Sequence, residues 1–253
     1  MKSRLYDKLT PISSGKIAVL VDPDKQTPSE LLDLVEAAVR CRVDFFFVGG
    51  SLLLENNLSA TVKTIKAHCT IPVILFPGNN YQLCEEADAL LLLSLISGRN
   101  PEYLIGQHVV AAPLIKESGI EAIPTGYLLI DGGKISTTSY ITQTVPIPAD
   151  KPDVAVATAL AGEQLGLKLI YLEAGSGAAN PVSAEMISAV KKNVSLPLIV
   201  GGGIRSGAQA EAACQAGADI IVVGNILEKA PELLMELSLA VHGTHQTTNE
   251  NKA

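Results

Sequence analysis

Three short apolar segments in the second half of the chain constrain its fold most, because each of them ends abruptly in glycine. They span residues 169–177 (LIYLEAGSG), 198–206 (LIVGGGIRS) and 219–225 (DIIVVGN). Their aliphatic and β-branched residues leave no polar face, which is typical of strands buried on both faces of a parallel sheet. Helical segments are expected between them, at 183–193 and 206–216, which gives the strand–helix alternation of such a sheet.

The glycines at the ends of these strands indicate that a ligand approaches the backbone closely. In (β/α)8 barrels, the loops after the last strands bind phosphate through backbone N–H groups and the N-terminus of a short helix. The triple glycine at 201–203 is the most specific local signal, although barrels with many different activities share it. The sequence therefore predicts a phosphate site at the loops after these three strands.

The rest of the chain repeats the same alternation. Earlier strands are expected at residues 16–21, 44–48, 73–76, 89–93 and 122–130. Helices are expected from about residue 27 and at about 53–68, 101–117, 152–165 and 231–241. Eight strand–helix units in 253 residues match one (β/α)8 barrel, which has roughly 250 residues. We therefore expect an α/β fold with a single TIM barrel over residues 1–242 and a disordered C-terminal tail over 243–253.

One segment interrupts this regular spacing. Residues 134–150 form a long polar stretch, rich in Ser, Thr and Pro, between the fifth strand and the next helix. Loops of that length inside a compact domain are usually functional or mobile. We therefore interpret this segment as a candidate lid.

The composition argues against several classes of function. A net charge of −7, a pI of about 5.1 and the lack of a basic stripe argue against nucleic-acid binding. No apolar segment approaches the ~20 residues of a membrane span and no signal peptide is recognisable, so we expect a cytoplasmic protein. The scattered cysteines are expected to be buried thiols in a reducing compartment: Cys41, Cys69, Cys84 and Cys214. The histidines are expected at the surface of helices or in the tail, away from the chemistry: His68, His108, His242 and His245.

Oxygen-bearing side chains follow the first two strands. Asp22 ends the first strand and Ser51 follows the second, so both are expected at adjacent strand ends, where barrels carry their chemistry. A carboxylate and a hydroxyl can supply the few oxygens that Mg²⁺ takes from a protein while a substrate phosphate fills other positions. Both residues also have a structural interpretation, since Asp22 can form a turn with Asp24 and Ser51 can cap a helix.

Glu173 stands in the middle of an apolar segment, just after a buried strand. A carboxylate in that position is costly unless it is paired or reaches water, which favours a functional role, with general base as the first choice. Tyr171, two residues earlier, can either offer its hydroxyl to a phosphate or fill the barrel.

Six separated motifs together resemble the geranylgeranylglyceryl phosphate synthase family, which includes the bacterial heptaprenylglyceryl phosphate synthases. They are VDPDK at 21–25, VGGS at 48–51, FPGN at 76–79, YLEAGSG at 171–177, VGGGIR at 200–205 and VGN at 223–225. The resemblance covers about residues 5–240. It implies a (β/α)8 barrel that uses Mg²⁺ to join geranylgeranyl diphosphate, or a similar prenyl diphosphate, to the 3-hydroxyl of sn-glycerol 1-phosphate in ether-lipid synthesis.

The resemblance also implies roles for individual residues. Asp22 and Ser51 would bind the magnesium ion, and Glu173 would help to deprotonate the attacking hydroxyl. The residues implied to hold sn-glycerol 1-phosphate are Tyr171, Leu172, Glu173, Ala174, Gly175, Ser176, Gly177, Gly202, Gly203, Gly224 and Asn225. Two residues before Asp22 the chain has Leu20, where the Bacillus-type branch has a lysine that contacts phosphate. The motif that begins at Tyr171 is more similar to the archaeal and Bacteroidetes-like members.

A prenyl tail needs a long apolar groove, which we expect near the second to fourth strands and their helices. The expected wall residues are Phe46, Leu52, Leu53, Ile96 and Tyr103. The resemblance further implies a homo-oligomer, either a dimer or a hexamer of dimers. Release of a lipid product suggests a peripheral encounter with a membrane.

Two other functions are compatible with parts of the sequence. A sugar-phosphate isomerase or cyclase of the histidine or tryptophan pathways could use Asp22 and Asp131 as an acid–base pair. The histidine-pathway barrels, however, carry two phosphate sites related by half-barrel repetition, and this sequence has no second glycine-rich segment like residues 201–203 after its third or fourth strand. A non-catalytic phosphate-binding barrel would keep the glycines but would have no reason for carboxylates at strand ends.

Overall fold

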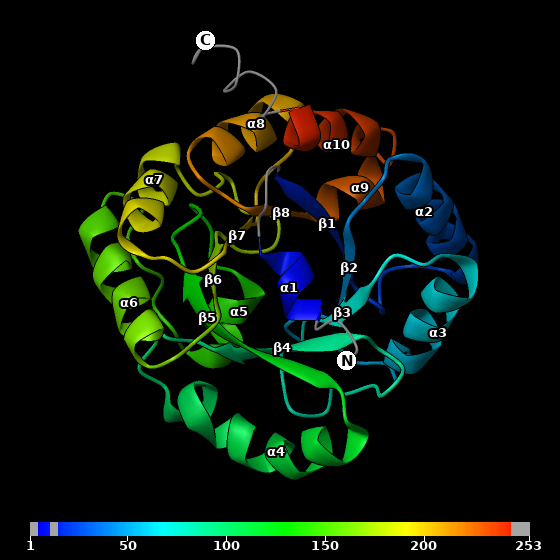
Figure 1. Ribbon diagram of the computed structural model, residues 1–253, viewed down its shortest axis with the longest axis horizontal. Helices are drawn as coiled ribbons and strands as arrows, with labels where there is room; N and C mark the ends of the chain where they lie inside the picture. Colours follow the sequence, from blue (N-terminus) through cyan, green and yellow to red (C-terminus); the bar gives the residue numbers. More distant parts are fainter. Residues whose placement is uncertain (1–4, 11–14, 244–253) are drawn as a thin grey trace.

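The computed structural model describes residues 5–10 and 15–243, and its centre is a closed barrel of eight parallel strands (Figure 1). The strands pair in chain order, and β8 returns to pair with β1. Their bounds are β1 (Lys16–Val21), β2 (Phe45–Val48), β3 (Val73–Leu75), β4 (Ala89–Ser94), β5 (Glu121–Leu129), β6 (Leu169–Glu173), β7 (Leu198–Gly201) and β8 (Ile220–Val223). The expected TIM barrel is confirmed.

The larger helices form a ring around the barrel, whereas α1 lies over its centre in this view (Figure 1). Their bounds are α1 (Leu5–Leu9), α2 (Pro28–Arg40), α3 (Leu58–His68), the π-helix η1 (Glu102–Gly106), α4 (Gln107–Ser118), α5 (Thr137–Thr142), α6 (Pro152–Gln164), α7 (Ala184–Asn193), α8 (Gly207–Gln215), α9 (Asn225–Lys229) and α10 (Leu233–Gly243). Thr27 caps α2 in a capping box with Glu30, and Pro28 occupies the first turn.

The connection between β3 and β4 differs from the regular pattern. Residues 76–88 contain no helix, so the count of eight strand–helix units was wrong at this point. The segment begins with Pro77 and Gly78, residues that favour turns over helices. As a result, η1 and α4 are the helical elements beside the outer face of β4, which leaves room for a cavity there.

Other departures affect the loops at the carboxyl ends of the strands. The third helix begins at Leu58 rather than at residue 53, because the Asp24 carboxylate accepts hydrogen bonds from the backbone N–H groups of Leu54 (2.6 Å) and Glu55 (3.4 Å) and holds that segment as a loop. The polar stretch 134–150 contains the short helix α5, which Ser136 caps. A further short helix, α9, follows β8 directly.

The apolar core has two layers, because the side chains of each strand alternate between the inside of the barrel and the surrounding helices. An aromatic stack fills part of the barrel interior: Phe76 lies 6.3 Å from Phe47, 6.0 Å from Tyr127 and 5.3 Å from Tyr171 between ring centroids, and the two tyrosines are 5.3 Å apart. The amino-terminal end of the barrel is closed by α1, whose Leu5 N–H donates to the carboxylate of Glu121 at 2.6 Å. Residues 244–253 of the expected disordered tail lie outside the described residues, whereas Gly243 ends α10.

Candidate active site

A polar cleft opens at the carboxyl ends of the strands and gathers most of the residues singled out in the sequence. Asp22 and Ser51 line it from the β1 and β2 sides. Eight further residues from the sequence motifs line it from the β6 to β8 sides: Tyr171, Glu173, Ser176, Gly177, Gly202, Gly203, Gly224 and Asn225. Segments separated by more than 200 residues in the sequence therefore meet in one place.

The remaining predicted site residues contribute differently. Leu172 and Ala174 belong to the core layer between the strands and the helices, so only their backbone can face a ligand in the cleft. The Gly175 N–H donates a 2.7 Å hydrogen bond to Glu173 Oε1, which gives this glycine a role in holding the carboxylate.

Backbone conformation explains the glycines of the loop after β7. Gly202 and Gly203 have φ values of +78° and +75°, a region that favours glycine. A Cβ on Gly202 would also overlap Oε1 of Glu173. The loop after β6 is tied to the start of α9, because the Ser176 hydroxyl donates to Asn225 Oδ1 at 2.7 Å. These contacts bring the loops after β6, β7 and β8 together at one side of the cleft.

Glu173 is the buried carboxylate of the site, and 6% of its surface is exposed. Burial raises its pKa from 4.5 to about 7, against the opposing effect of the Gly175 N–H. The Tyr171 hydroxyl lies near the Glu173 carboxylate, since a Cβ on Gly201 would touch both groups. Among the described residues, however, the Tyr171 hydroxyl has no partner in hydrogen-bonding geometry. A carboxylate that titrates near neutral pH can accept a proton from a substrate hydroxyl.

Asp22 and Ser51 both line the cleft, and Gly50 lies next to both of them. A Cβ on Gly50 would lie 3.5 Å from Asp22 Oδ2, and the Ser51 side chain follows in the next position of the chain. Asp22 Oδ2 also pairs with Lys25 Nζ at 3.0 Å, and Oδ1 accepts from the Asp24 N–H at 3.2 Å, so the expected turn forms as well. Ser51 does not cap a helix, because α3 begins seven residues later with Asn57 before it.

The donor set fits a magnesium ion that is shared with a substrate. Asp22 and Ser51 offer hard oxygen atoms, and Asp24 of the same cleft has a buried Oδ1 that finds no hydrogen-bond partner among the residues that the structure describes. Within the described part of the chain, no group of three or more His, Cys, Asp or Glu side chains could hold a metal ion alone. Mg²⁺ commonly keeps only one or two protein carboxylates and completes its octahedron with phosphate oxygens and water.

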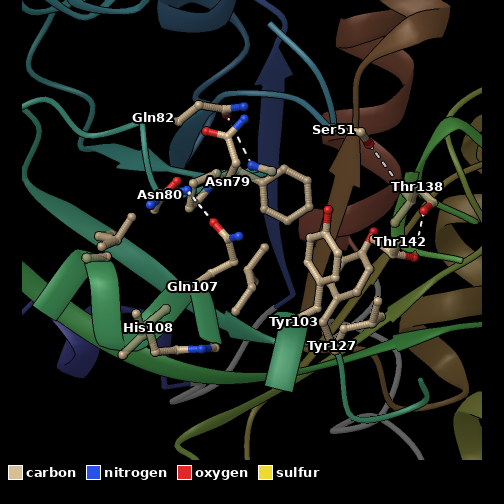
Figure 2. Close-up of a pocket in the computed structure, with 18 of the residues that line it drawn as sticks. Ser51, Asn79, Asn80, Gln82, Tyr103, Gln107, His108, Tyr127, Thr138 and Thr142 are labelled. Atoms are coloured by element: carbon tan, nitrogen blue, oxygen red, sulfur yellow. Dashed lines mark hydrogen bonds between the residues drawn. The ribbon is translucent and has the colours of Figure 1, made fainter. Parts of the chain in front are cut away.

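A second, mainly apolar cavity adjoins the cleft and extends between β4, the β3–β4 connection and α4 (Figure 2). Leu90, Leu92 and Leu93 of β4 line it, and Ala111 and Ile115 line it from α4. Strand β4 and helix α4 run in opposite directions, so Leu90 and Ile115 lie at the deep end and Tyr103 and Gln107 near the mouth.

This cavity corrects the predicted groove wall. Tyr103 lines the apolar cavity, as expected. Phe46 is fully buried, and Leu53 and Ile96 pack against the same core layer, so these three residues do not line it. Leu52 lines the polar cleft instead.

The structure also corrects the prediction that every histidine lies at the surface, away from the site. His108 is a half-buried part of the cavity wall, where burial lowers its pKa and its Nε2 lies 3.2 Å from Ser94 Oγ. His242 pairs with Asp44 at 2.9 Å, and His68 is exposed on α3. His245 lies outside the described residues. The expectation that all histidines sit away from the site was therefore wrong for His108.

Five residues line both the polar cleft and the apolar cavity and so mark their junction: Gly50, Ser51, Phe76, Tyr127 and Thr138. By contrast, Asp131 lines neither hollow, and its carboxylate accepts from the Gly133 N–H at 2.9 Å within its own turn. The acid–base pair of Asp22 and Asp131 that an isomerase would need does not form. No helix in residues 5–10 and 15–243 has the length and apolar character to cross a membrane.

The chain is similar to known proteins over most of its length. The PcrB family model matches residues 12–241. A geranylgeranylglyceryl phosphate synthase from Chitinophaga pinensis is 55% identical over 225 residues, which cover 89% of each chain. One from Methanothermobacter marburgensis is 44% identical over 224 residues, covering 88% of this chain and 91% of the relative.

Solved structures are similar over nearly the whole barrel. The (S)-3-O-geranylgeranylglyceryl phosphate synthase of Thermoplasma acidophilum, crystallised with its substrate sn-glycerol-1-phosphate, superposes with a TM-score of 0.86 at 35% identity and covers 91% of this chain and 94% of its own. Tryptophan synthase from M. tuberculosis reaches a TM-score of 0.57 at 16% identity, with 94% of this chain and 96% of its own covered. The second likeness concerns the fold alone.

Proposed function

The chain belongs to the PcrB family of geranylgeranylglyceryl phosphate synthases, and we propose that its two adjoining hollows divide the two substrates between them. It is a prenyltransferase that transfers a prenyl group to sn-glycerol 1-phosphate and forms an ether-linked lipid precursor. The junction between a polar cleft and an apolar cavity carries the proposal, because a phosphorylated alcohol and a prenyl chain need these two environments side by side.

In this proposal the polar cleft holds sn-glycerol 1-phosphate. Its phosphate binds the loops after β6, β7 and β8, where Gly202, Gly203 and the Ser176–Asn225 pair present N–H and hydroxyl groups. Tyr171 and Glu173 lie below the cleft, so the glycerol hydroxyls point toward the barrel axis. The bound sn-glycerol-1-phosphate of the Thermoplasma acidophilum relative supports this choice of ligand.

The prenyl chain then occupies the apolar cavity, with its diphosphate at the junction. Leucines of β4 and the small side chain of Ala111 leave an apolar passage along α4. The diphosphate reaches Asp22 and Ser51, where Mg²⁺ would be held between these two residues and the phosphate oxygens. When bound, the magnesium ion offsets the negative charge of the leaving diphosphate.

The chain's own residues position one substitution at carbon. The 3-oxygen of glycerol phosphate forms a bond to C1 of the prenyl group, the bond from C1 to the diphosphate oxygen breaks, and the hydroxyl proton passes to Glu173. The pKa of about 7 lets Glu173 be deprotonated for this step at neutral pH. Because the allylic carbon tolerates positive charge, the site needs orientation and one modest base rather than a strong nucleophile.

The first test is an assay of the purified protein with Mg²⁺, sn-glycerol 1-phosphate or its 3-phosphate enantiomer, and prenyl diphosphates of increasing length. We expect the ether product by mass spectrometry from the 1-phosphate, and none after EDTA treatment. Equal product with EDTA would refute the magnesium role, and no product with any donor would refute the division of substrates.

We also propose that the chain forms a dimer or a hexamer of dimers. The outer face of η1 and α4 supports this, since Ile105, Val109, Val110 and Leu114 are 50–64% exposed there. Light scattering tests the state of the wild type, and Val109→Asp should lower the mass if this face is the interface. Leu165→Asp, at an exposed apolar residue after α6, is the matched control.

Product release suggests a brief contact with a membrane. Loops at the mouth expose Leu54, Ile135 and Tyr140 by 80% or more, and such side chains can enter the lipid interface. Flotation with liposomes, with and without the prenyl product, tests this contact. Protein that never floats with product-loaded vesicles would contradict it.

A further inference from the structure

Thr138 occupies the junction of the two hollows, and neither the sequence motifs nor the proposed substrate contacts account for it. It belongs to α5, in the segment 134–150 that follows β5. Its hydroxyl lies 2.8 Å from Ser51 Oγ (Figure 2). Since β3 and β4 separate β2 from β5 in the barrel, this hydrogen bond crosses the mouth above two strands.

Helix α5 holds Thr138 in a fixed place. Ser136 caps the helix by accepting from the Ser139 N–H at 3.0 Å. The Thr142 hydroxyl donates to the Thr138 carbonyl at 2.7 Å, and Asn100 Nδ2 donates to the Thr142 carbonyl at 2.9 Å. Because these hydrogen bonds hold the helix at both ends, the Thr138 side chain can fix the orientation of a neighbouring side chain.

The direction of the hydrogen bonds around Thr138 follows from chemistry. A serine oxygen that coordinates a cation uses a lone pair, so its proton must point away and needs an acceptor. Thr138 Oγ1 is at the right distance to accept it.

We propose that Thr138 is a positioning residue of the transfer reaction: by accepting the Ser51 proton, it turns the Ser51 lone pairs toward the magnesium ion and the diphosphate. The inference rests on the proposed placement of the metal at Asp22 and Ser51. It gives the segment 134–150 a defined task, since this segment brings the acceptor to the other side of the mouth.

Three variants test the proposal. Thr138→Val keeps the shape of the side chain and removes the hydroxyl, and Thr138→Ser restores the hydroxyl. Thr158→Val makes the same change on α6, away from both hollows, where the hydroxyl donates to the Val154 carbonyl at 2.7 Å. Each variant is compared with the wild type by thermal unfolding, so that loss of folding is recognised.

Metal binding is measured without turnover. Free Mn²⁺ is followed by electron paramagnetic resonance in the presence of geranylgeranyl diphosphate and in the absence of glycerol phosphate. Loss of an outer-shell partner lowers metal affinity by about 10–100-fold, so we expect Thr138→Val to weaken Mn²⁺ binding by at least ~10-fold. Thr138→Ser and Thr158→Val should bind Mn²⁺ as the wild type does, and calorimetry should give the same affinity for sn-glycerol 1-phosphate in all four proteins.

The possible results separate this inference from the function on which it rests. Wild-type Mn²⁺ binding in a folded Thr138→Val variant would overturn the positioning role alone. Equal loss of Mn²⁺ and sn-glycerol 1-phosphate binding would also overturn it, because Thr138 would then only support the fold of the cleft. A wild-type protein that binds no Mn²⁺ with the prenyl diphosphate would overturn the metal placement itself.

Discussion

Replacing Glu173 by Gln should lower activity and, at the same time, raise stability in a pH-dependent way. The carboxyl is 6% exposed and its pKa is raised by burial from 4.5 to about 7. Gln keeps the acceptor for the Gly175 N–H but never carries the charge. Loss of the base should lower kcat by about 10²–10⁴-fold with a modest change in KM.

The stability effect follows from proton linkage. Below pH 4.5 the carboxyl is protonated in both the folded and the unfolded chain, so Glu and Gln should be equivalent. Between pH 4.5 and 7 the unfolded chain loses the proton while the folded chain keeps it, and the free energy of unfolding of the wild type falls. Above pH 7 the buried charge costs about 3 kcal/mol relative to Gln, at 1.36 kcal/mol per pKa unit.

Urea unfolding of wild type and Glu173→Gln from pH 4 to pH 8 measures this difference. Glu163→Gln is the control with the opposite expected change in stability. Ser195 donates to the partly exposed Glu163 carboxylate through its hydroxyl and its N–H, and these hydrogen bonds lower the Glu163 pKa. That variant should lose stability at neutral pH and approach the wild type as the pH falls. A Glu173→Gln variant with full turnover, or with no stability gain above pH 7, would refute the assignment of Glu173 as a buried base.

Three further substitutions test separate parts of the site. Asp22→Asn should raise the Mg²⁺ concentration for half-maximal rate by at least ~10-fold while the KM for sn-glycerol 1-phosphate stays nearly constant, and parallel loss of both would remove Asp22 from the metal site. Gly202→Ala places a Cβ against Glu173 at a φ of +78°, so it should cost about 1–2 kcal/mol of stability and raise the KM for sn-glycerol 1-phosphate. An unchanged KM in steady-state assays would argue against a phosphate-binding site at this loop. Ala111→Phe should fill the cavity and disfavour long donors by about 1–3 kcal/mol in kcat/KM, and an unchanged chain-length profile would place the prenyl chain elsewhere.

The strands and the polar cleft could be predicted because their signals are local. Buried parallel strands appear as short apolar runs, and glycines in the loops after β6 and β7 have the positive φ values that glycine favours. The closed barrel then brings Asp22, Ser51 and Glu173 to one end, since all parallel strands end on the same side.

The apolar cavity could not be predicted in the same way. In β2, all four residues are buried, so the sequence does not reveal that Phe47 faces the barrel interior while Phe46 faces the helices. The cavity also depends on the absence of a helix from residues 76–88, between β3 and β4. The regular alternation of the other strands and helices led to a count of eight strand–helix units instead. The only sequence signal for Thr138 was its place in the long polar segment, because its importance comes from a contact 87 residues away.

The aromatic stack beneath the cleft gives the protein an intrinsic optical probe. The chain has six tyrosines and no tryptophan, so its aromatic fluorescence is dominated by tyrosine. Tyr127 and Tyr171 are both buried in the stack and both line the cleft. Their fixed, asymmetric packing should produce a near-ultraviolet circular dichroism band that changes when a ligand settles above them, which would allow occupancy of the cleft to be followed without a label.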